Sequence, residues 1–141
     1  MADYFTFASF VVPVGAGRAV DAATAYHRLF MVDDGLIEPL GVDAGEVYGL
    51  PQMEADGDNA VWLSHDESLD VEVTCRVVQW LQDGWGAPDR VEFEWADVCS
   101  KPRLGAFHGG AAVVRRDRVQ IVGTGEVFEL MDERPHLGEI S

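Results

Sequence analysis

The segment Val91-Glu92-Phe93-Glu94-Trp95 constrains the fold most, because apolar and acidic residues alternate along it without exception. Side chains along a β-strand point to opposite faces in turn. The pattern therefore predicts a strand that turns Val91, Phe93 and Trp95 inward and leaves Glu92 and Glu94 in water.

Four further segments carry strand signals. Residues 4–13 are dense in aromatic and β-branched side chains, which predicts a central strand buried on both faces. Residues 60–64, centred on Trp62, form another short apolar run. Residues 111–115 and 118–122 flank Arg116-Asp117, which favours a hairpin.

Two segments favour helices. Small and aromatic residues recur at helical spacing over residues 17–31. Residues 69–81 fit both periods: an alternating strand, or a helix whose buried face is formed by Leu69, Val73, Val77, Trp80 and Leu81. We favour the helix because its pattern persists longer. A short last helix at 125–131 is also expected.

A helix over residues 69–81 requires residues that cap its N-terminus and a face of polar side chains exposed to water. Start signals are available at Ser64 with Glu67, or at Asp66 and Ser68. The helical pattern leaves four polar side chains toward water, namely Asp70, Glu72, Arg76 and Gln82.

The order of these segments predicts the fold class. Residues 33–58 are rich in Gly and Pro and are expected to be a loop with a short strand at 47–50. Short links between the last strands favour an α+β fold, a mainly antiparallel sheet with two helices packed on one face. We expect one domain over 1–131 and a flexible tail over 132–141.

Net charge limits the partners. The 141 residues include 10 Lys+Arg and 25 Asp+Glu, a formal charge of −15. Such a chain repels nucleic acid and anionic membranes, so direct binding to either is not expected. No apolar run reaches bilayer length, and the two cysteines are few for a disulfide framework. These features predict a soluble, cytoplasmic protein with reduced thiols.

The acidic residues are unevenly placed. Twelve carboxylates and no Lys or Arg lie between Arg28 and Arg76, whereas half of the basic residues fall within 101–118. One interpretation is general acidity for solubility. The other is a polyanion-like surface that binds a basic groove. Its expected partner-binding residues are Asp33, Asp34, Glu38, Asp43, Glu46, Glu54, Asp56 and Asp58.

The sequence indicates a catalytic or metal site less strongly than it indicates a binding surface. His65, Cys99 and His108 supply the residue types of a thiol nucleophile with an imidazole base, without a local signature. No metal-ligand spacing occurs, and we expect neither a metal nor a cofactor.

The segment W-x-x-x-C-S-K-P-R, Trp95 to Arg103, continues through a Gly-rich loop with Gly109-Gly110 into a further strand. In this it resembles a family of small proteins carried by bacterial plasmids and phages. The resemblance implies a mobile genetic element as setting, and no reaction. Lys101-Pro102 favours a rigid turn, so a second contact site is expected at Cys99, Ser100, Lys101, Arg103 and His108.

Together these features favour a non-enzymatic acidic binding protein of a mobile element. It would act as an inhibitor, an immunity-type protein or a nucleic-acid mimic, by occupying a basic surface of a partner protein such as a nucleic-acid-binding host protein. The alternative is a small enzyme or ligand-binding domain with a pocket near His65, Cys99 and His108.

Overall fold

The computed structural model describes residues 4–32, 50–65, 69–99 and 108–123. In chain order the elements are β1 (Tyr4–Pro13), α1 (Ala19–Tyr26), η1 (His27–Val32), β2 (Gln52–Ala55), β3 (Ala60–His65), α2 (Val71–Gly84), β4 (Val91–Cys99), β5 (His108–Val114) and β6 (Val119–Gly123).

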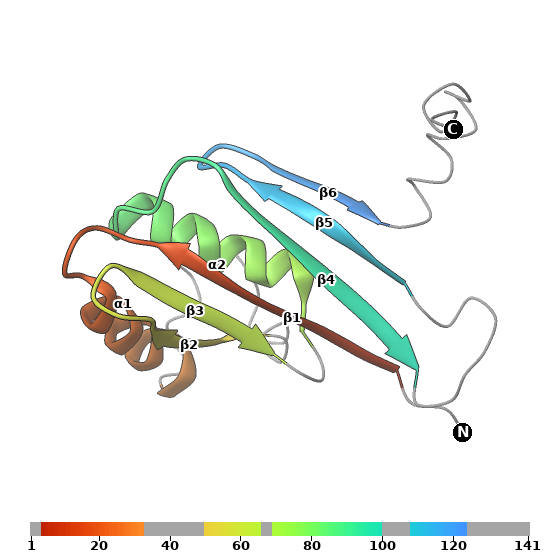
Figure 1. Ribbon diagram of the computed structural model, residues 1–141, viewed down its shortest axis with the longest axis horizontal. Helices are drawn as coiled ribbons and strands as arrows, with labels where there is room; N and C mark the ends of the chain where they lie inside the picture. The colour runs from red at the N-terminus through yellow and green to blue at the C-terminus, as the bar shows by residue number, and fades with distance from the viewer. Residues whose placement is uncertain (1–3, 33–49, 66–68, 100–107, 124–141) are drawn as a thin grey trace.

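The strands form one antiparallel sheet in the order β2-β3-β1-β4-β5-β6. Helices α1 and α2 lie behind the sheet in Figure 1, on one face of it. The opposite face, which we call the open face, carries no helix in the described part of the chain. The α+β class and the antiparallel sheet with helices on one face are thereby confirmed.

The core lies between the helices and the sheet. Its fully buried side chains come from every layer and include Val12, Tyr26, Met53, Leu63, Val77 and Leu81. The Tyr26 hydroxyl donates to the carbonyl of Pro51 at 2.5 Å, so the one polar group of this ring is satisfied inside the core.

Strand β1 changes partners along its length. Residues Tyr4–Phe7 pair with Cys99–Ala96 of β4, whereas Ala8–Pro13 pair with His65–Ala60 of β3. The predicted strand at 4–13 is thus confirmed, but its burial on both faces is wrong: Phe7 and Val11 are 37% and 49% exposed. Aromatic and β-branched residues suit a pleated backbone whether or not a second layer covers it.

The predicted second helix is confirmed as α2, but two of its details are wrong. Its N-cap is Asp70, whose side chain accepts from the Val73 amide at 3.0 Å, not a residue in 64–68. Gln82 is fully buried rather than in water. Its amide donates to the carbonyls of Val114 at 2.8 Å and Pro88 at 3.0 Å, which tie the helix to β5.

The alternating segment behaves as predicted within the longer strand β4. Val91 and Phe93 are buried and Trp95 is half-buried, whereas Glu92 and Glu94 are exposed. The predicted hairpin is confirmed as β5 and β6, closed by the Arg115 amide donating to the Arg118 carbonyl.

Gly109-Gly110 belongs to strand β5, so its placement in a connecting loop is wrong. Gly110 pairs with Trp95. A Cβ on Gly110 would overlap the backbone carbonyl oxygen of Val122 and would lie 2.5 Å from Cη2 of Trp95, closer than van der Waals contact allows. The glycine thus makes room for the indole across the strand.

The N-terminal helical segment is confirmed, with α1 continuing into η1 up to Val32. The expected loop over 33–58 is partly wrong, because Gln52–Ala55 forms strand β2 and pairs with β3. Within β2 the apolar and buried residue is Met53, and one such residue beside Pro51 and Gly57 gives no periodic signal in the sequence.

Three predicted segments lie outside the described residues: the helix at 125–131, the tail at 132–141 and most of the short strand at 47–50. No helix in the described ranges is long and apolar enough to span a membrane.

Candidate functional site

The open face gathers exposed apolar side chains. Alternate residues of β1 point away from the helices, which places Phe7, Ser9 and Val11 on this face, and Trp62 of β3 pairs with Val11. Among the described residues, four large apolar side chains are exposed: Phe7, Val11 and Trp62 here, and Val20 on α1. Three of the four therefore share one face, and a patch of this kind marks interaction sites.

Trp62 is held in a defined position. Its indole Nε1 donates to the Ser9 hydroxyl at 2.7 Å across the strand pair. Trp62 also stands opposite Glu54 of β2 in the register. A large ring that is fixed in advance loses little conformational entropy when a partner packs on it.

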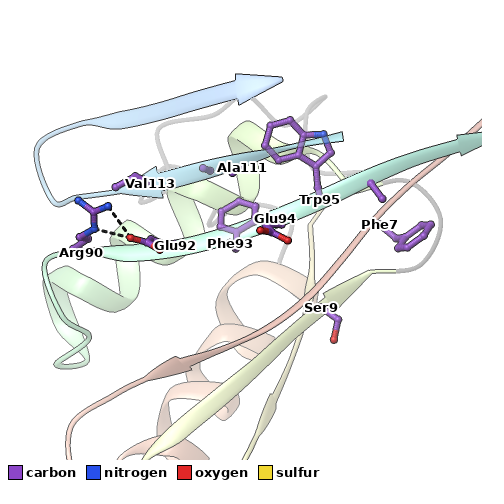
Figure 2. A pocket seen from close by; sticks show the side chains of 11 residues that line it. Phe7, Ser9, Arg90, Glu92, Phe93, Glu94, Trp95, Ala111 and Val113 are labelled. Carbon is purple, nitrogen blue, oxygen red and sulfur yellow. Dashed lines mark hydrogen bonds and ion pairs between the residues drawn. The ribbon is translucent and has the colours of Figure 1, made fainter. Parts of the chain in front are cut away.

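A hollow of about 680 Å³ lies on the open face between β1 and β5. Phe7 and Ser9 of β1, Glu92 and Glu94 of β4, and Ala111 of β5 line it together with their neighbours (Figure 2). The hollow forms because β1 leaves β4 after Phe7 to pair with β3, and because the nearest residue of β5 is only an alanine.

A second hollow of about 350 Å³ lies on the other side of β1. Phe7 and Ser9 line both hollows, and Trp62, Ser64 and Gln52 complete the second one. The two hollows thus flank a ridge made by β1.

The two carboxylates of the larger hollow differ in their partners. Glu92 is paired with Arg90, with Nη2 and Oε1 2.7 Å apart and Nε and Oε1 2.8 Å apart. Figure 2 shows Glu92 turned toward Arg90, while Glu94 lies farther along β4, nearer to Phe7. Glu94 makes no ion pair or hydrogen bond with any residue that the structure describes. Of the two carboxylates in this hollow, it is therefore the one without a partner among the described residues.

The acidic surface predicted from the sequence is described in part. Glu54, Asp56 and Asp58 are exposed and lie on or beside the β2–β3 hairpin. The other five residues of the prediction, Asp33, Asp34, Glu38, Asp43 and Glu46, lie outside the described residues.

The basic residues of the β5–β6 turn lie at the opposite edge of the sheet from this hairpin. Strand spacing puts the two hairpins about 19 Å apart across the sheet. Arg115 faces Asp89 at 3.8 Å, and the Arg116 amide donates to the same carboxylate at 3.2 Å. Acidic and basic turns are therefore separated, and the basic one is partly neutralised.

The residues considered for nucleophilic chemistry lie toward the other end of the sheet. Cys99 ends β4, His108 opens β5 opposite Asp97, and His65 ends β3 opposite Ala8. Cys99 pairs with Tyr4, so the register separates it from His65 by about 13 Å along β1 and by two strand spacings. The register thus gives no support to a His65–Cys99 pair. Ser100, Lys101 and Arg103 lie outside the described residues.

Two buried titratable groups are inside the core rather than at a surface. Burial raises the pKa of the Tyr26 hydroxyl well above its usual value, and it raises the pKa of the Cys75 thiol to about 12. Cys75 is a free cysteine, 1% exposed. Within the described ranges, no three His, Cys, Asp or Glu side chains gather to hold a metal ion.

The sequence did not point to the open face as a site. The run from Tyr4 to Val12 is apolar on both faces, so no polar alternation separates Phe7 and Val11 from Phe10 and Val12. Thr6 and Ser9 interrupt the run with hydroxyl side chains, and Ser9 lies on the open face. Comparisons with protein-family models, with curated proteins and with solved structures give no match for this chain.

Proposed function

We propose that this chain is a binding protein without catalytic chemistry, and that its open face docks on a basic surface of a partner protein. The composition of that face carries the proposal. Phe7, Val11 and Trp62 are exposed there, and Glu54 and Glu94 are exposed beside them without an ionic partner among the described residues. Apolar contact gives affinity, and unpaired carboxylates select partners of positive charge.

The charge of the whole chain agrees with this choice of partner. A net charge of −15 attracts basic proteins over long range and repels nucleic acid. Such a protein acts as an inhibitor, an immunity-type protein or a mimic of nucleic acid, and its partner is a protein with a basic groove. A mobile genetic element is the setting that the Trp95–Arg103 segment suggests.

A matched pair of double variants tests the proposal. Val11→Lys with Glu54→Lys changes the open face, and Val20→Lys with Glu72→Lys makes the same substitutions at exposed positions of α1 and α2. Each form is immobilised and exposed to a bacterial lysate at about 0.1 M and about 1 M salt, since screening separates electrostatic from apolar capture. Circular dichroism checks that all forms fold.

We expect a basic protein to be retained by the wild type and by the helix variant, to be lost from the open-face variant, and to dissociate at high salt. Equal retention by both variants overturns the proposal. So does equal loss from both variants, or the absence of any basic protein retained by the wild type.

A further inference from the structure

We infer that the 680 Å³ hollow on the open face binds a guanidinium group, and that the partner therefore presents an arginine side chain to Glu94. This inference rests on the proposed function and specifies the chemistry of the contact. Four observations lead to it: the position of the hollow within the sheet, the unpaired carboxylate of Glu94, the aromatic ring of Phe7, and the small side chains of Ala96 and Ala111.

The hollow is built into the sheet rather than lying in a loop. Backbone pairing between β1 and β4 runs from Tyr4 with Cys99 to Phe7 with Ala96, and from Ala8 onward β1 pairs with β3. The strands that border the hollow are thus fixed by pairing on their other edges. A site on paired strands holds its groups in place before a ligand arrives.

The hollow carries one carboxylate without a partner among the described residues, that of Glu94. Glu92 is neutralised by Arg90, whereas Glu94 has no partner in the described part of the chain. Arg90 is also the one basic residue among those that line the hollow. A cation that enters therefore meets one free carboxylate at Glu94.

The walls favour guanidinium over the other cations. A metal ion requires several hard ligands, and the described residues gather no such group. An ammonium is compact and strongly hydrated, so it gains little against apolar walls. A guanidinium is planar and weakly hydrated, it binds a carboxylate through two parallel hydrogen bonds, and it stacks on aromatic rings.

The neighbouring side chains fit that shape. Phe7 lines the hollow and is 37% exposed, and Figure 2 shows Phe7 and Glu94 on the adjoining strands β1 and β4. Across the strand from Glu94 stands Ala111, and Ala96 follows on the same face, so methyl groups line the hollow on this side of the carboxylate. The aliphatic stem of an arginine can lie on these methyl groups while its head reaches Glu94.

Short peptides test the inference without knowledge of the partner. The probes are acetyl-Gly-Arg-Gly amide and its lysine and citrulline counterparts, titrated into the full ¹⁵N-labelled chain while backbone amide shifts are recorded. Citrulline has nearly the shape of arginine and lacks its charge. We expect the arginine probe to shift the amides of Phe7, Ser9 and Glu94–Ala96, and to bind more tightly than either counterpart.

Glu94→Gln is expected to weaken the arginine probe about tenfold, the effect of losing a charge-assisted hydrogen bond. Glu72→Gln is the matched control, because it removes the same charge from an exposed position on α2, outside the hollow and away from the open face. It should change affinity by less than about twofold. Equal binding of arginine and lysine probes, equal effects of the two variants, or shifts away from the hollow would overturn the inference.

The two proposals fail independently. The lysate experiment changes Val11 and Glu54 and leaves Glu94 in place, so capture there with no arginine selectivity here would overturn only the guanidinium site. Arginine binding in the hollow without a captured basic protein would overturn the proposed function and retain the site.

Discussion

Phe10 of β1 and Phe93 of β4 stack face to face, with ring centroids 4.4 Å apart and ring planes inclined by 6°. The pair stands three residues beyond the last backbone pair of the two strands, Phe7 with Ala96. Phe93 also lines the hollow on the open face. The two rings thus hold the strands together on the helix side at the place where backbone pairing between them has ended.

Phe93→Ala is expected to lower the free energy of unfolding by about 3–5 kcal/mol, because it removes a buried ring from the core. Phe10→Ala should have a similar but smaller effect, since Phe10 is half-buried. A double-mutant cycle measured by urea denaturation should give a coupling of about 0.5–1.5 kcal/mol for the stacked pair. Strictly additive losses would show that the stack adds nothing beyond burial.

Asp70 is expected to stabilise α2 from its N-terminus. Its carboxylate accepts from the Val73 amide at 3.0 Å, so Asp70→Ala leaves that amide unpaired and should cost about 1 kcal/mol of stability. Asp83→Ala is the control, because Asp83 is exposed in the last turn, where a negative charge opposes the helix dipole. Thermal unfolding followed by circular dichroism should show a loss for the first variant and none for the second.

The sequence was sufficient for elements whose burial alternates with a simple period. Glu92 and Glu94 alternate with buried neighbours in β4, and Leu69, Val73, Val77 and Leu81 are all buried at helical spacing. In both segments the core lies on one side, so polarity along the chain reports the face.

Features that depend on distant residues were missed. Gln82 has the polarity of a surface residue, and its bonds to the carbonyls of Pro88 and of Val114, the latter 32 residues away, offset the cost of its burial. The hollow likewise depends on β1 changing partners from β4 to β3 after Phe7. No local pattern in an apolar run encodes that change, which is set by long-range strand pairing.

Gly110→Ala is expected to destabilise the sheet by about 1–3 kcal/mol, because its Cβ would overlap the carbonyl oxygen of Val122 and the indole of Trp95. Gly84→Ala is the control: its Cβ would meet nothing within 4 Å, and Gly84 closes α2, where alanine is a better helix former. Urea denaturation of both variants measures the difference. Equal stability of the two variants would mean that Trp95 and the β6 backbone at Val122 both move aside at little cost.

Cys75 is expected to be unreactive in the folded protein and to make stability depend on pH. In a Cys99→Ser background its thiol is the only one, and burial both excludes reagent and raises its pKa from 9.0 to about 12. An aromatic disulfide reagent should therefore react slowly at neutral pH and completely in concentrated guanidinium chloride.

The raised pKa also makes stability depend on pH between 9.0 and about 12. In this interval the unfolded thiol loses its proton while the folded thiol keeps it, so the unfolded state binds fewer protons. The free energy of unfolding therefore falls as pH rises through the interval. Below pH 9.0 both states keep the proton and the contribution is constant. Cys75→Ala should remove this slope: the stability difference between this variant and its parent, measured by urea denaturation, should shrink with rising pH. A difference that stays constant across the interval, or rapid labelling of the native thiol, would contradict the burial of Cys75.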